Sequence, residues 1–145
     1  MADAAAMEAA GARFAQKAQA VRLVCLHGPL GAGKTTFVRG LLRELGHVGP
    51  VKSPTFTLVE PYDLPGGPVR HFDFYRVDDP AELDLIGLRD YLDDKNLCVV
   101  EWAERAVDVL PVADVDVMIS PTTMGRHVTY LAHSNRGRNL LDGLK

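Results

Sequence analysis

The sequence has few of the features that mark secreted, membrane-spanning or disulfide-stabilised proteins. Its two cysteines, Cys25 and Cys98, are too few for a disulfide framework, and each lies in an apolar run typical of a buried strand. No apolar run approaches the roughly 18 to 20 residues that a membrane-spanning helix requires. Residues 1–20 carry acidic and basic side chains among their alanines, unlike a secretory signal. These absences predict a soluble cytoplasmic protein with no membrane partner.

A large excess of charge of one sign is also missing. The 16 Lys and Arg residues against 19 Asp and Glu residues leave a formal net charge of −3. Such a balance does not favour a protein that coats nucleic acid through a basic surface. The 145 residues, 47% of them hydrophobic, suit one core. We therefore expect a single domain over residues 1–145.

Hydrophobic periodicity divides the chain into alternating helices and strands. Helical spacing predicts helices over 3–20, 34–45, 79–88 and 139–145. Short apolar or alternating runs predict strands over 21–26, 56–62, 69–75, 97–100, 115–119 and 127–132. Between the first strand and the second helix lies a glycine-rich segment. The order of strand, loop and helix is the setting in which phosphate-binding loops occur.

That segment carries the strongest motif of the chain. Residues 28–35 read GPLGAGKT, the Walker A pattern of Gly, four residues, Gly-Lys and then Ser or Thr. Glycines let successive backbone N–H groups point inward, and the following helix adds the positive end of its dipole. The motif therefore predicts a triphosphate site. Its expected members are Leu30, Gly31, Ala32, Gly33, Lys34, Thr35 and Thr36.

Three side chains of the motif have expected roles. Lys34 places a compact positive charge between the β- and γ-phosphates, and the hydroxyl of Thr35 is placed to ligate Mg²⁺. The Thr36 hydroxyl either reaches the α-phosphate or bonds back to its own helix.

Two acids are candidates for the second magnesium anchor. Glu101 follows the apolar run 97–100, as the acid of a Walker B strand does, and is otherwise a surface acid. Asp73 lies in HFDFYR (71–76), where alternation places it on one face with His71. There it orients the attacking water or supports Mg²⁺, or else forms an ion pair with a nearby arginine. We expect Lys34, Asp73 and Glu101 to be catalytic, with Thr35 and Glu101 as metal ligands.

Three further features have open roles. The segment 53–57 (SPTFT) lies where many P-loop hydrolases sense the γ-phosphate with hydroxyl groups. Trp102 either stacks near the nucleotide, lies at a partner surface or packs in the core. Arg126 either contacts phosphate or base, or is a surface arginine.

Several sequence blocks, in order, resemble the TsaE family (also called YjeE), small bacterial P-loop ATPases required for threonylcarbamoyladenosine formation in tRNA. The blocks are 28–40 (GPLGAGKTTFVRG), 51–62 (VKSPTFTLVEPY), 71–76 (HFDFYR), 86–91 (IGLRDY) and 100–102 (VEW). The resemblance implies an α/β fold, with a P-loop NTPase-like mixed sheet that has a parallel core and antiparallel additions, flanked by helices.

The resemblance also implies an activity and its partners. It implies ATP and Mg²⁺ bound by Lys34, Thr35 and Glu101, a supporting catalytic role for Asp73, and Arg126 near the nucleotide. It implies binding to the TsaB and TsaD proteins, with tRNA reached through that complex. Hydrolysis, weak in the isolated protein, would reset the complex between turnovers.

The chain departs from the family pattern at two places. Pro29 replaces the usual Asp of the loop, which removes one backbone N–H and one charge at its outer edge. We expect the inner phosphate contacts to survive. The N-terminal helix lacks the polar and acidic residues that often open the family, so its contacts with adenine stay open.

Two other functions fit the Walker A motif. A small-molecule kinase would use the same loop to transfer phosphate to a substrate hydroxyl. The chain shows no insert for a lid or acceptor domain, which disfavours this reading. A nucleotide-gated binding module would use ATP only to order a docking surface, with incidental hydrolysis. The sequence does not separate this third possibility from an ATPase.

Overall fold

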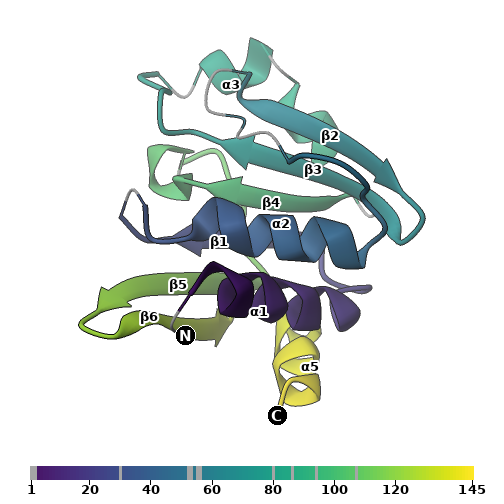
Figure 1. The fold of residues 1–145 in the computed structure, drawn as a ribbon. Coiled ribbons are helices and arrows are strands. Elements are labelled where there is room, and N and C mark those ends of the chain that lie inside the picture. The colour runs from purple at the N-terminus through teal and green to yellow at the C-terminus, as the bar shows by residue number, and fades with distance from the viewer. Residues whose placement is uncertain are drawn as a thin grey trace.

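A mixed six-stranded sheet forms the centre of the computed structural model (Figure 1). The structure describes residues 3–145 except 30, 52, 53, 55, 56, 80, 86, 94 and 107. Its strands are β1 (Leu23–His27), β2 (Val59–Leu64), β3 (Gly67–Asp73), β4 (Leu97–Glu101), β5 (Val115–Thr122) and β6 (Gly125–Ala132). Its helices are α1 (Ala4–Gln16), α2 (Lys34–Glu44), α3 (Glu82–Leu85), α4 (Leu88–Tyr91), the 3-10 helix η1 (Ala103–Ala106) and α5 (Asn135–Gly143).

The strand order is β2-β3-β4-β1-β5-β6. Neighbours within β3-β4-β1-β5 are parallel, and the edge strands β2 and β6 are antiparallel to their neighbours. This confirms the expected α/β class with a parallel core and antiparallel additions. Because β1, β3 and β4 are parallel, their carboxyl ends lie at one edge of the sheet, where the glycine-rich loop begins.

Helices α1 and α2 cover one face of the sheet and lie against each other (Figure 1). Two glycines permit this close approach. A Cβ on Gly11 would overlap the carbonyl oxygen of Phe37, and a Cβ on Gly40 would overlap that of Glu8. Between helices and sheet, the rings of Phe14 and Phe37 meet edge to face with centroids 5.6 Å apart. α1 therefore holds α2, and the loop that precedes it, against β1.

The second face carries a separate core built around Phe72 and Phe74 and covered by α3, α4 and η1. Cys25 and Cys98 are free thiols buried in this core, and burial raises the pKa of each to about 12. They therefore pack as small neutral side chains in this core, as the sequence indicates. The helix predicted over 79–88 is present only as α3. A second short helix, α4, begins at Leu88 after Gly87, which adopts a left-handed conformation with φ of 72°.

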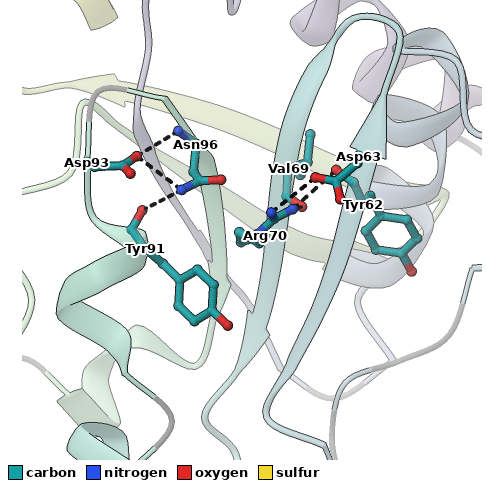
Figure 2. A network of polar contacts seen from close by, with 7 residues as sticks. All are labelled: Tyr62, Asp63, Val69, Arg70, Tyr91, Asp93 and Asn96. Atoms are coloured by element: carbon teal, nitrogen blue, oxygen red, sulfur yellow. Dashed lines mark hydrogen bonds and ion pairs between the residues drawn. The ribbon is translucent and has the colours of Figure 1, made fainter.

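Polar contacts fix the end of the sheet away from the glycine-rich loop (Figure 2). Asn96, just before β4, donates two hydrogen bonds to Asp93 Oδ1, from its backbone N–H at 2.9 Å and from its side-chain amide at 3.0 Å. On β3, the guanidinium of Arg70 donates to Asp63 Oδ1 at 3.1 Å. These contacts stabilise the turn before β4 and the pairing of β3 with β2.

The C-terminal elements differ from the sequence prediction in their bounds. The strand pair β5–β6 is present and extends beyond the predicted ranges to a tight turn at 123–124. Helix α5 begins at Asn135, not at residue 139, because the Ser134 hydroxyl caps it by accepting from the Gly137 N–H at 3.0 Å. Helix α1 ends at Gln16, four residues before the predicted end. Within the described part of the chain, no helix has the length and apolar character needed to cross a membrane.

Candidate nucleotide-binding site

The Walker A segment forms the turn between β1 and α2, as its sequence context predicts. Gly31 and Gly33 have φ values of 78° and 111°, which side chains other than glycine rarely adopt. Within the described residues, no side chain caps the start of α2 at Gly33. The helix N-terminus therefore presents its free N–H groups and positive dipole end toward the loop, as an anion site requires.

Lys34, the first residue of α2, lies folded over this loop. Its ammonium donates to the carbonyl oxygen of Gly28 at 2.5 Å and lies 3.9 Å from the centroid of the Trp102 ring. Burial lowers the pKa of the lysine, while the negative charges of Glu101 and Asp73 act in the opposite direction. Lys34 is thus a desolvated cation next to two carboxylates, at the position where the motif requires a phosphate ligand.

Strands β3 and β4 bring both predicted acids to this lysine. Asp73 and Glu101 are register partners in the parallel β3–β4 pair, and only 4% and 3% of their surfaces are exposed. The Thr35 hydroxyl lies 3.4 Å from Glu101 Oε2. Asp73 accepts a hydrogen bond from the Tyr75 N–H at 2.9 Å. Glu101 is therefore not a surface acid, and Thr35, Asp73 and Glu101 form one group of oxygen donors beside Lys34.

His71 belongs to the same site, a contact that the sequence did not reveal. Its Nε2 lies 2.6 Å from Glu101 Oε2, the oxygen that also faces Thr35, and the residue is fully buried. The alternation along β3 placed His71 on the face of Asp73. Its partner was not evident, because Glu101 lies 30 residues further along the chain.

Trp102 follows Glu101 directly and turns out of the sheet with a φ of 59°, an unusual value for a bulky residue. Its ring lies over Lys34 and 4.9 Å from the ring of Tyr75, measured between centroids. One side of the indole also packs against the second core. The tryptophan therefore forms one wall around the lysine, and the strained turn is what directs it there.

Arg126 reaches the loop from the start of β6. Its Nε donates to the Ala32 carbonyl at 3.0 Å and its Nη2 to the Gly31 carbonyl at 3.2 Å. A cavity of about 180 Å³ lies beside these contacts. It is lined by Asp3, Ala4, Met7, Gly31, Ala32, Gly33, Thr36 and Arg126. Arg126 is thus a support of the loop as well as part of a cavity wall.

Most predicted site residues therefore meet at one edge of the sheet. Gly31, Ala32, Gly33 and Thr36 line the cavity, and Lys34, Thr35, Asp73, Glu101 and Trp102 lie together at the ends of β3 and β4 and the start of α2. Leu30 lies outside the described residues, as do Ser53, Thr55 and Phe56 of the segment expected to sense the γ-phosphate. Pro29 is exposed, and its backbone carbonyl oxygen accepts a hydrogen bond from the Ala32 N–H at 3.1 Å.

The oxygen donors fit magnesium better than a metal held entirely by protein. Among the described residues, no group of three or more His, Cys, Asp or Glu side chains is arranged to hold an ion. Magnesium usually keeps several waters and binds through one or two carboxylates plus substrate phosphates. A hydroxyl on Thr35 and a carboxylate on Glu101, with Asp73 adjacent, provide that kind of partial shell.

The family model for threonylcarbamoyl adenosine biosynthesis protein TsaE matches residues 1–128, which include every site residue named above. The chain belongs to the TsaE family. A tRNA threonylcarbamoyladenosine biosynthesis protein TsaE from Haemophilus influenzae is 46% identical over 119 residues, covering 82% of this chain and 75% of the relative. A protein of the same name from Bacillus subtilis is 38% identical over 123 residues, covering 84% and 77%.

The fold agrees with this membership of the TsaE family. A crystal structure of Bacillus subtilis YdiB superposes with a TM-score of 0.84 at 29% sequence identity, covering 99% of this chain and 90% of that one. The agreement extends over nearly the whole chain, so the mixed sheet and both layers are shared with a solved structure.

Proposed function

We propose that this TsaE-family chain is a Mg²⁺-dependent ATPase that supports threonylcarbamoyladenosine modification of tRNA together with TsaB and TsaD. One observation carries the nucleotide part of this proposal. The Thr35 hydroxyl of the glycine-rich loop meets the buried Glu101 carboxylate at 3.4 Å, next to the ammonium of Lys34. The pathway and the partners rest on the family to which the chain belongs.

Each side chain would have a distinct part in hydrolysis. The loop N–H groups and Lys34 would bind the β- and γ-phosphates, because both place positive charge where phosphate oxygens gather. Asp73 would orient the attacking water by accepting a hydrogen bond from it. Trp102 and Tyr75 would restrict water on one side of the lysine, since their rings already pack there.

Thr35 and Glu101 would hold magnesium, directly or through water. When bound, Mg²⁺ neutralises charge on the phosphate oxygens as the terminal phosphoryl group is transferred. The position of Glu101 at the end of β4 supports this role, because the strand is buried on both faces and keeps the carboxylate at the loop.

The cavity beside Gly31 and Arg126 supports binding of the rest of the nucleotide. It adjoins the loop on the side of Thr36, where the chain of phosphates would continue toward ribose and base. Its wall from α1 includes the Met7 side chain, an apolar surface that suits a flat aromatic base. Asp3 would face the polar edge of the ligand.

The first experiment identifies the nucleotide and the product. Purified protein is incubated with Mg-ATP alone and with TsaB and TsaD, and release of ADP and inorganic phosphate is measured. We expect slow release from the isolated chain and a change in rate with partners. Lys34→Ala should abolish the release of ADP and phosphate. Lys95→Ala should leave it unchanged, because Lys95 is exposed just before β4, at the end of that strand opposite the loop. A phosphorylated metabolite in place of inorganic phosphate would indicate a kinase.

A second experiment separates an ATPase from a nucleotide-gated binding module. The Asp73→Asn variant is designed to bind ATP without cleaving it. It is added with TsaB, TsaD and tRNA, and modified nucleoside is counted over many turnovers. We expect the modification to stop after an initial turnover. Sustained modification by a variant that binds but does not cleave ATP would make hydrolysis incidental.

A further inference from the structure

We propose that His71 is a positioning residue that fixes the carboxylate of Glu101 for metal binding by donating a hydrogen bond from Nε2. This inference rests on the proposed function, because it concerns the acid to which that proposal assigns the magnesium ion. The two atoms, His71 Nε2 and Glu101 Oε2, are 2.6 Å apart, and both residues are buried. Hydrogen bonds to an ionised partner are shorter than neutral ones, and this distance is short.

The direction of this bond follows from the chemistry of its partners. An ionised carboxylate only accepts, so the hydrogen lies on Nε2 of the histidine. The other ring nitrogen, Nδ1, is buried and has no hydrogen-bond partner within the described residues. Glu101 is therefore the polar contact that accounts for a histidine at this position, where an apolar side chain would fill the same space without burying an unpaired nitrogen.

His71 and Thr35 hold the same oxygen from two different elements. Glu101 Oε2 lies 2.6 Å from His71 Nε2, on β3, and 3.4 Å from Thr35 Oγ1, on α2. A carboxylate has about four acceptor positions, so two donors leave capacity for a metal ion or for one of its waters. Fixing one oxygen from two sides sets the orientation of the carboxylate plane. Groups that orient a metal ligand in this way commonly alter metal affinity strongly when they are removed.

The strand register explains how one short segment supplies two parts of the site. Asp73 pairs with Glu101 and His71 pairs with Val99, so both side chains of β3 lie on the face that α2 covers. Asp73 then lies beside Glu101 at the carboxyl ends of the strands, and the buried His71 lies two residues earlier on β3. A histidine ring is long enough to reach Glu101 from that position, whereas an asparagine side chain is too short.

The test compares variants that keep or lose the donor. His71→Leu and His71→Asn remove the donor at the Nε2 position, and His71→Gln places an amide N–H near it. ADP binding is measured by calorimetry across a magnesium series and again with chelator present. We expect His71→Leu and His71→Asn to raise the half-saturating magnesium concentration on the order of 10- to 100-fold, with metal-free ADP binding unchanged. His71→Gln should restore most of the loss, and His127→Gln on the exposed side of β6 serves as the surface control.

The outcomes separate this inference from the proposed function. Wild-type ADP binding that does not respond to magnesium would overturn the proposed function. Wild-type binding that responds, with the same half-saturating concentration in His71→Asn, would overturn the role of His71 alone. Equal loss in the Gln and Asn variants would also overturn it, because the donor would then not matter. If His71→Leu does not fold, the comparison of His71→Asn with His71→Gln tests the role of the donor, since both variants keep a polar side chain.

A spectroscopic measurement tests the bond without nucleotide. The ¹⁵N shifts of the His71 ring in the wild-type protein should indicate a hydrogen on Nε2. Glu101→Gln should move the Nε2 resonance, whereas Glu44→Gln, an exposed acid on α2, should not. A ring that carries its hydrogen on Nδ1 and none on Nε2 would contradict the proposed donor.

Discussion

Asp73 and Glu101 are register partners at the carboxyl ends of the adjacent parallel strands β3 and β4, and both are nearly fully buried. The positive charge of Lys34 lies close enough to interact with both carboxylates and offsets their repulsion. Burial lowers the pKa of that lysine, and the two acids oppose the shift. The acids have different neighbours: Glu101 faces Thr35 and His71, and Asp73 faces the Tyr75 N–H.

We predict that the two acids separate into a binding and a chemical role. Asp73→Asn should leave ATP affinity near the wild-type value and lower single-turnover hydrolysis by about 10²- to 10⁴-fold, the usual loss for a group that activates water. Glu101→Gln should instead weaken the dependence of binding on magnesium. Equilibrium binding and rapid quench of both variants check this. Unchanged turnover in Asp73→Asn would remove Asp73 from the mechanism.

Lys34→Ala should weaken ADP and ATP binding. The loss of a charge-assisted contact to phosphate costs about 1.5 to 3 kcal/mol of binding free energy, which raises the dissociation constant roughly 10- to 100-fold. The variant should also lose some stability, because the two buried carboxylates then lack the lysine charge near them. Calorimetric titration measures the affinity and circular dichroism the fold. Wild-type affinity in this variant would mean that the loop does not bind phosphate.

Arg126→Ala should also weaken nucleotide binding, through the loop itself. Arg126 donates to the carbonyl oxygens of Gly31 and Ala32, and each bond contributes about 0.5 to 1.5 kcal/mol. We expect roughly a tenfold loss of affinity. The exposed Arg136 on α5 provides the matched control as Arg136→Ala. The same small loss in both variants would point to general electrostatics instead of loop support.

Gly40→Ala should destabilise the protein, although alanine favours helices. Its Cβ would overlap the Glu8 carbonyl oxygen of α1, so the two helices must move apart. Overpacking of this kind costs about 1 to 3 kcal/mol. Gly143→Ala is the control, because it lies in α5 and meets only the flexible side chain of Lys17. That variant should be neutral or slightly stabilising by urea denaturation; equal effects of the two changes would contradict close packing at Gly40.

Asp114→Asn should lower stability at neutral pH and reduce its acid dependence. Burial raises the pKa of Asp114, but hydrogen bonds from the Arg22 N–H, the Ser134 hydroxyl and the Leu23 N–H outweigh it and leave the pKa lowered. A carboxyl whose pKa is lower in the folded state stabilises the protein above its unfolded pKa, about 3.9, and this contribution is lost as pH falls through the folded value.

We expect a loss of about 1 to 3 kcal/mol near pH 7, because hydrogen bonds to a charged acceptor are removed. The difference between wild type and variant should shrink below about pH 4, as the wild-type carboxyl becomes protonated. Urea denaturation at several pH values measures both effects. A difference that stays constant down to pH 2 would contradict the pKa direction.

Much of the fold followed from local patterns in the sequence. The strand, glycine-rich loop and helix at 23–44 were predicted because glycine spacing and apolar runs are local signals. The bounds that failed also have local causes. Ser134 caps the start of α5, four residues before the start predicted at 139, and the left-handed Gly87 separates α3 from α4 near the end of the helix predicted over 79–88.

The sequence by itself determined which residue types the site contains: a phosphate-binding loop with its lysine and threonine, and an acid at the end of each of two apolar strands. Only the tertiary structure decided how they meet. The order β3-β4-β1 places Asp73 and Glu101 beside the loop, and the pairing of strands 30 residues apart joins His71 to Glu101. Arg126 reaches the loop from the far edge strand for the same reason. Such contacts depend on strand order and register, which hydrogen bonds between distant segments fix and which no local pattern of side chains records.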